Sequence, residues 1–306
     1  MNVREWALPV YTILMQTATG SLSFLWVFRL RQSRHRGSDE SSVSLDIPLT
    51  IILITIIFAM VGSHFHLSRP YLSLLAVTNL RSSWLSREIL FTILLFLFTF
   101  SMWVLHRAHR SFERLIDVLG WLGIISGWAM VYCMARIYLL PTQMAWNSPA
   151  TMLYYLGSTL LLGSSALLAM LWMDQHFIDV RDPGSSDQVL TQQPKLLTTM
   201  GGVVLATAFL DVVLELIRMG SLRTGNEAAR ISLELLFGLY QPLLYMRVGF
   251  VLIGSAWLAY STFQLVRERN NYRNLLLPVY SSFMLLMIGE ILGRFLFYAT
   301  HVRIGL

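Results

Sequence analysis

Two short segments place titratable side chains where one apolar run ends and another begins. The segment GSHFHLSRP, residues 62–70, carries His64 and His66, and LSREIL, residues 85–90, carries Glu88. A histidine titrates near neutral pH, and a carboxylate can accept a proton. Such a pair flanking one crevice could serve a reaction that moves two protons, so these residues are the first candidates for chemistry.

Helical geometry separates the two histidines. Two positions along a helix turn the side chain by about 200°, so both histidines cannot face one pocket unless the helix has already ended. His66, beside the turn into Arg69 and Pro70, is the better candidate for facing inward. The alternatives are that both histidines are merely interfacial and that Glu88 only stabilises a helix start through the helix dipole.

A second set of ionisable residues lies in the last apolar run, within GEILGRFLFYATH. Glu290, Arg294, Tyr298 and His301 fall at i, i+4, i+8 and i+11, which places them on one helical stripe. Ionisable groups inside a membrane cost about 2.5 kcal/mol or more and are functional candidates. Glu290 and Arg294 stand in the favourable order for an ion pair, so they either neutralise each other and pin the helices or bind a ligand.

A third acidic stretch is FLDVVLELIR, residues 209–218. Asp211 and Glu215 share one helical face, and Glu215 can pair with Arg218 one turn later. Asp211 lies about 12 Å from the expected outer helix end and has no partner in its own helix. It therefore either meets another helix or titrates.

The elements that position these residues are membrane helices. The chain has 306 residues, of which 55% are hydrophobic and only 13% charged, whereas a soluble domain is nearer a quarter charged. Its net charge of +6 comes almost wholly from arginines between apolar runs, which topology explains better than nucleic-acid binding. The single cysteine, Cys133, cannot hold an iron–sulfur cluster or a tetrathiolate zinc site.

The expected fold is an all-α integral membrane bundle forming one polytopic domain. Eight stretches contain the roughly 20 apolar residues that a spanning helix needs. They are approximately 6–28, 48–67, 88–106, 116–138, 150–172, 197–219, 247–265 and 276–298. We expect solvated loops at 29–42 and 174–195, and a semi-apolar segment at 69–88 that lies on the membrane surface or folds over the bundle. Gly289 and Gly293 predict a close helix approach.

The distribution of basic residues predicts the orientation. Loops after odd-numbered helices carry twelve arginines and lysines, against eight in the other loops and at the termini. The twelve are Arg29, Arg31, Arg34, Arg36, Arg107, Arg110, Arg114, Arg181, Lys195, Arg267, Arg269 and Arg273. The positive-inside rule then places both termini outside, together with His66 and Glu88.

Several common sites are not predicted. A b-type haem needs histidines that face each other within the bundle, and all seven histidines fall in loops or at expected helix ends. The sequence shows no phosphate-binding glycine loop, no zinc-ligand spacing and no nucleophile elbow. We therefore expect no metal or haem in this chain.

Four segments resemble one family. HLSRP, NLRSSWLSREI, MARIY and GEILGRFLFYATH are similar, in order and spacing along most of the chain, to segments of the membrane anchor subunit of dimethyl sulfoxide reductase. The chain is more distantly similar to polysulfide reductase-type and nitrite reductase-type anchors. The acidic LDVVLELIR departs from the family pattern, so no role for it follows from the resemblance.

The resemblance implies an eight-helix subunit of the bacterial inner membrane without its own haem or iron–sulfur cluster. It would anchor a four-cluster iron–sulfur subunit and a molybdopterin catalytic subunit on the periplasmic face, and oxidise menaquinol in anaerobic electron transport. The histidine and the glutamate that support quinol oxidation in the family match His66 and Glu88 here.

We expect the quinol pocket at the outer ends of the second, third and fourth helices, under residues 69–86. Its rim candidates are Arg69, Trp84, Arg136, Tyr138 and Arg247, of which Arg136 and Tyr138 lie in a matching segment. Three alternatives remain open. The anchor could run in reverse and reduce quinone for a dehydrogenase, the chain could be a purely structural anchor, or it could be a secondary transporter with broken helices and midplane sites.

Overall fold

The structure is a computed structural model that describes residues 3–34, 45–64, 77–108, 112–181, 194–268 and 276–302. These residues form eight long α-helices and one short one, with no strand among them. The helices are α1 (Val3–Arg34), α2 (Asp46–His64), α3 (Trp84–Ala108), α4 (Glu113–Ile137), α5 (Pro149–Arg181), α7 (Pro194–Arg223), α8 (Glu227–Phe237), α9 (Gln241–Glu268) and α10 (Leu276–Ala299).

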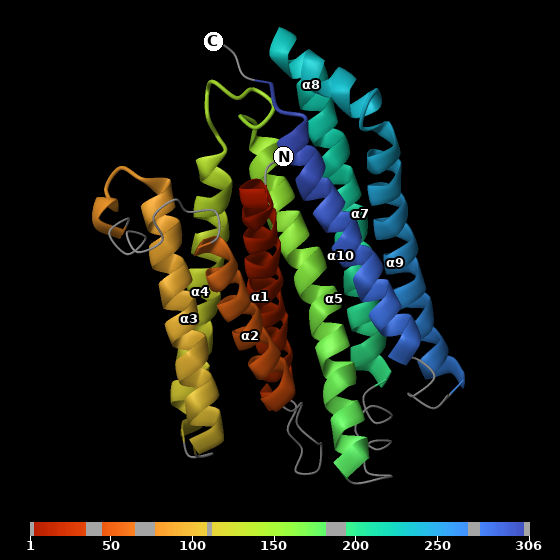
Figure 1. The fold of residues 1–306 in the computed structure, drawn as a ribbon. Coiled ribbons are helices and arrows are strands. Elements are labelled where there is room, and N and C mark those ends of the chain that lie inside the picture. The colour runs from red at the N-terminus through yellow and green to blue at the C-terminus, as the bar shows by residue number, and fades with distance from the viewer. Residues whose placement is uncertain are drawn as a thin grey trace.

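The long helices form a bundle in which consecutive members run in opposite directions (Figure 1). The start of α1 and the end of α10 lie at one end of this bundle, which we call the terminal end. The starts of α3, α5 and α9 and the ends of α2, α4 and α7 lie at the same end, and α8 follows α7 there. This arrangement brings the end of α2 and the start of α3 to the same side of the molecule.

Seven of the long helices are long and apolar enough to cross a membrane, namely α2, α3, α4, α5, α7, α9 and α10. The first helix, which the sequence also suggested as a span, does not reach that hydropathy. It packs against α2, α4, α5 and α10, and its polar side chains face these neighbours. The buried polar residues of α1 are Thr12, Gln16, Thr17, Thr19 and Ser21. A helix enclosed by other helices can carry such residues because little of its surface meets lipid.

Several helix ends differ from the expected bounds. The helix α1 continues to Arg34 and α5 to Arg181, so parts of the segments expected as loops are helical. The helix α9 begins at Gln241, and the short α8 was not expected at all. Hydropathy reports only the apolar part of a helix, whereas capping and polar turns extend it. In α8, for example, the Asn226 side chain accepts a hydrogen bond from the Ala229 amide.

Glycines allow the closest helix contacts. A Cβ atom on Gly20 of α1 would overlap the α5 backbone at Thr159 and Gly163, so only glycine fits this crossing. The predicted close approach of the last helix is confirmed. A side chain at Gly289 or Gly293 would meet residues of α9, including Arg247.

Candidate functional site

Glu88 lies in the second turn of α3, at the terminal end. The helix begins at Trp84, and the Ser83 hydroxyl accepts a hydrogen bond from the Ser86 amide at 3.2 Å, so Ser83 caps this end. The Glu88 side chain is only 5% exposed. A carboxyl group removed from water at a helix end is a candidate for proton chemistry, as the sequence suggested.

Groups from α3 itself and from two other helices lie around Glu88. The Thr92 hydroxyl, one turn later, donates to the Glu88 carbonyl oxygen at 2.9 Å. The hydroxyl of Tyr11 from α1 lies 2.9 Å from the Thr92 hydroxyl and also interacts with the Glu88 carboxyl group. Cys133 of α4 interacts electrostatically with the same carboxyl group. The site therefore combines α1, α3 and α4.

Two arginines stack on the indole ring of Trp84 at the start of α3. The guanidinium carbon of Arg87 lies 4.2 Å from the ring centroid and that of Arg136 lies 4.9 Å from it. Arg87 also donates to the carbonyl oxygens of Leu80 and Arg81 at 2.8 Å each, which holds the turn before α3. Arg136 differs, because its buried Nε has no hydrogen-bond partner within the described residues. The predicted rim residues Trp84 and Arg136 are thus brought together.

Tyr138, immediately after α4, joins this region to α10. Its hydroxyl lies 2.6 Å from that of Tyr298, and its ring contacts those of Trp146 and Phe297. Burial raises the pKa of Tyr138 well above its usual value, and Tyr298 is the next contributor. Glu88 raises the pKa of the same hydroxyl, so the two groups interact. Tyr138 therefore stays protonated and can act as a hydrogen-bond donor.

The remaining terminal-end candidates have different placements. His66 and Arg69 lie outside the described residues, so their roles stay predictions. His64 is exposed at the end of α2, with Nδ1 2.7 Å from the Met60 carbonyl oxygen. His301 stacks on Trp146, with ring centroids 4.8 Å apart.

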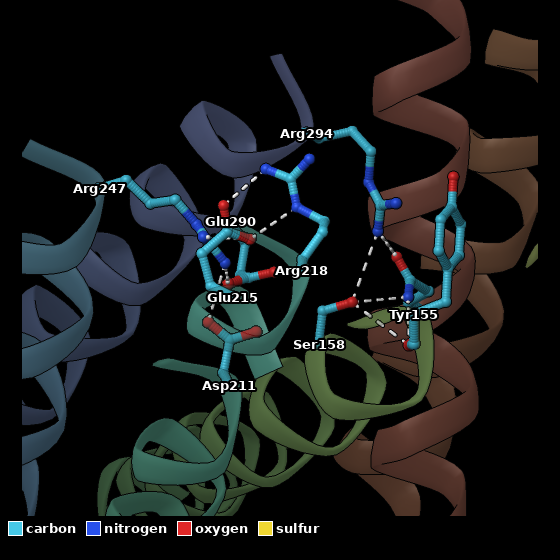
Figure 2. A network of polar contacts seen from close by, with 9 residues as sticks. Tyr155, Ser158, Asp211, Glu215, Arg218, Arg247, Glu290 and Arg294 are labelled. Carbon is cyan, nitrogen blue, oxygen red and sulfur yellow. Dashed lines mark hydrogen bonds and ion pairs between the residues drawn. The ribbon is translucent and has the colours of Figure 1, made fainter. Parts of the chain in front are cut away.

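A second buried polar region lies between α7, α9 and α10 (Figure 2). Arg247 of α9 contacts three carboxylates. Its guanidinium nitrogens lie 3.0 Å from Asp211, 2.9 Å from Glu215 and 3.7 Å from Glu290. The Arg218 guanidinium group donates two hydrogen bonds to the Glu215 carboxylate, at 2.6 and 3.1 Å. Arg247 therefore links its own helix, α9, to α7 and α10.

Arg294 of α10 extends this region toward α1 and α5. It donates to the Gln16 side-chain oxygen at 2.5 Å, and its guanidinium carbon lies 3.9 Å from the Tyr155 ring centroid. Tyr154 lies between Arg294 and Arg247, at 5.2 and 5.1 Å from their guanidinium carbons. We call the six charged residues the charge network. They are Asp211, Glu215, Arg218, Arg247, Glu290 and Arg294.

The charge network balances formally. It contains three carboxylates and three guanidinium groups, and each of the six residues is at most 2% exposed. Charges buried this far from water are tolerated when they are paired and hydrogen-bonded. These contacts link α9 to α7 and α10, and Arg294 links α10 to α1.

The structure settles several expectations about these residues. Asp211 does meet another helix, through Arg247, and the Glu215–Arg218 pair is confirmed. Glu290 and Arg294 do not form the expected ion pair, because each finds its partner on a different helix. Since α7 continues to Arg223, Asp211 lies about 18 Å from that helix end rather than 12 Å.

Sequence reasoning missed several residues of both regions. No role was assigned to Tyr11, Gln16, Tyr154 or Tyr155, yet Tyr11 interacts with Glu88 and the other three contact Arg247 or Arg294. The available signal was a polar group within an apolar run, which does not reveal its partner on another helix. Arg247, expected at the rim of the quinol pocket, instead has its contacts in the charge network.

Comparison with known proteins agrees with this architecture. The family model described as DMSO reductase anchor subunit (DmsC) matches residues 1–300. A search of curated proteins gave no significant match. The family match extends over nearly all of the 306 residues, including every helix that carries a candidate residue. The chain therefore belongs to the family of DMSO reductase anchor subunits.

Proposed function

We propose that this anchor subunit binds menaquinol at the terminal end of the bundle and oxidises it for an iron–sulfur partner subunit. Family membership supports association with iron–sulfur and catalytic subunits of the reductase. The carrying observation is the buried Glu88 carboxyl group near the start of α3, the helix that begins with Trp84, on whose ring Arg136 stacks.

Each of these residues has a chemical task in the proposal. Glu88 takes up one proton released by quinol oxidation, and His66 hydrogen-bonds one quinol oxygen. The unpartnered Nε of Arg136 is available to a quinol oxygen, and the Trp84 ring offers an apolar face to the quinol rings. Tyr138, at the end of α4, interacts with Glu88, and Arg69 completes the rim.

The packing of the helices and the distribution of basic residues support a membrane arrangement. We take α1 as the eighth span, because it packs against four of the seven apolar helices, α2, α4, α5 and α10. The excess of arginines in the opposite loops supports placing the terminal end in the periplasm. The iron–sulfur and molybdopterin subunits would then dock on the periplasmic face of the bacterial inner membrane and receive electrons there.

Replacing Glu88 by glutamine tests the proposal. In the assembled complex, Glu88→Gln should lower naphthoquinol oxidation about 100-fold or more, because a positioned proton acceptor contributes that much to a rate. The partner subunits should still co-purify. Glu113→Gln is the matched control, since Glu113 is also an acid near a helix start but is exposed at the opposite end of the bundle. Unimpaired turnover of Glu88→Gln would remove Glu88 from the reaction.

Assaying the same variants in both directions separates the alternatives. A chain that reduces quinone for a dehydrogenase would need the same groups, so Glu88→Gln would then impair quinone reduction. A purely structural anchor would keep full turnover in both assays. The helices of the charge network are continuous over their described residues, whereas a secondary transporter typically has broken helices at its binding site.

A further inference from the structure

The hydroxyl groups of Tyr11 and Thr92 lie near Glu88 and are hydrogen-bonded to each other. The Thr92 hydroxyl donates to the Glu88 carbonyl oxygen at 2.9 Å. A hydroxyl carries one proton, so Thr92 has none left for its second contact. The Tyr11 hydroxyl, 2.9 Å from the Thr92 oxygen, must therefore be the donor in that contact.

The Glu88 carboxyl group also interacts with the Tyr11 hydroxyl and is a second acceptor near it. Tyr11 is 7% exposed and Glu88 is 5% exposed, so little water is available to either group. Rotation of the Tyr11 O–H about its C–O bond redirects the proton without moving the ring. The Tyr11 oxygen keeps its lone pairs in either position and can accept a hydrogen bond from a protonated carboxyl group.

Resting on the proposed role of Glu88 in quinol oxidation, we propose that Tyr11 is a positioning residue whose hydrogen bond follows the charge of Glu88. When Glu88 is ionised, Tyr11 donates to the carboxylate. When Glu88 has taken a proton from quinol, Tyr11 donates to Thr92, and the Glu88 O–H donates to the Tyr11 oxygen. Tyr11 keeps its own proton throughout, and one proton moves, from quinol to Glu88.

Other groups facing Glu88 do not offer this arrangement. Cys133 comes from α4, Tyr138 follows α4, and Tyr298 comes from α10. The hydroxyls of Tyr138 and Tyr298 are hydrogen-bonded to each other at 2.6 Å. Among the described neighbours of Glu88, Tyr11 thus both interacts with the carboxyl group and has another acceptor, the Thr92 hydroxyl.

The pH dependence of quinol oxidation by the assembled complex tests the proposal. Turnover should rise with pH as Glu88 ionises. Tyr11→Phe removes a donor to the carboxylate and should move this rising limb to higher pH by about one unit. Thr92→Val removes the competing acceptor, leaves Tyr11 on Glu88, and should move the limb to lower pH. If the two substitutions only disturbed the local structure, they would lower the rate without shifting the rising limb in opposite directions.

Two further variants complete the experiment. Thr92→Ser keeps the hydroxyl and should restore the wild-type profile. Thr99→Val removes another fully buried hydroxyl of α3 and should leave the profile unchanged. Shifts of the Tyr11 and Thr92 variants in the same direction, or no shift, would overturn the proposal. If Glu88→Gln itself kept full turnover, the proposed function would fail instead, so the two failures are distinguishable.

Discussion

At the scale of single residues, the proposed quinol site assigns the orientation of quinol to Arg136. Its guanidinium stacks on Trp84, and its buried Nε has no partner within the described residues. A buried donor without a partner is costly, so a ligand oxygen bound there would stabilise the site. Arg136 is therefore expected to act in binding more than in proton transfer.

Substitution of Arg136 checks this expectation. Arg136→Met should raise the KM for naphthoquinol about tenfold with a smaller effect on kcat, because one hydrogen bond to quinol is lost. Arg107→Met is the control, since Arg107 also stacks on a tryptophan of α3, 4.6 Å from the Trp103 ring centroid, near the other end of that helix. An unchanged KM for Arg136→Met would remove Arg136 from the pocket.

Sequence reasoning named several residues of this region, and their role in a quinol site stays a prediction. Trp84, Glu88, Arg136 and Tyr138 were predicted from short segments, and the structure brings all four to the terminal end. Tyr11 was not predicted, because its relation to Glu88 spans almost eighty positions and depends on how α1 packs against α3. Periodicity within one helix carries no information about such a contact.

At the scale of helices, the charge network joins the last three long helices. Arg247 of α9 is the common partner of Asp211, Glu215 and Glu290. Removing it would leave buried carboxylates without their shared cation. Breaking a buried ion pair on one side costs about 3–5 kcal/mol, whereas a partly exposed pair contributes at most about 1 kcal/mol.

Thermal unfolding of the purified complex measures this difference. Arg247→Met should lower the unfolding midpoint by several degrees, on the scale of about 2–4 °C per kcal/mol for a domain of comparable size. Arg29→Met should change it little, because the Arg29–Asp117 pair is 27% and 43% exposed. Equal effects of the two substitutions would contradict the stabilising role assigned to the charge network.

Helix prediction succeeded where the physical signal was apolar length. The seven apolar spans fall where hydropathy placed them, with ends shifted by several residues. The short α8 escaped notice because it is amphipathic and lies outside the apolar runs. The first helix was expected as an ordinary span, but its neighbours enclose it, and the buried Gln16 and its other polar residues reflect that central place.

At the scale of the whole molecule, the two polar regions have different tasks. The terminal-end site around Glu88 is built from α1, α3 and α4, and the charge network from α7, α9 and α10. The aromatic cluster of Tyr138, Tyr155 and Tyr298 lies between them, with Arg294 stacked on Tyr155. We interpret the first region as the place of quinol chemistry and the second as the structural centre of the other half.

We propose that this chain passes electrons from quinol to an iron–sulfur partner subunit. The most direct test is to purify the chain from its native membranes, determine bound iron and sulfide, and add a naphthoquinol while following the clusters by electron paramagnetic resonance. We predict that an iron–sulfur subunit co-purifies and that quinol reduces its clusters in the wild-type complex but not in Glu88→Gln. A chain that purifies without an iron–sulfur protein, or clusters that quinol reduces equally well in Glu88→Gln, would contradict the account.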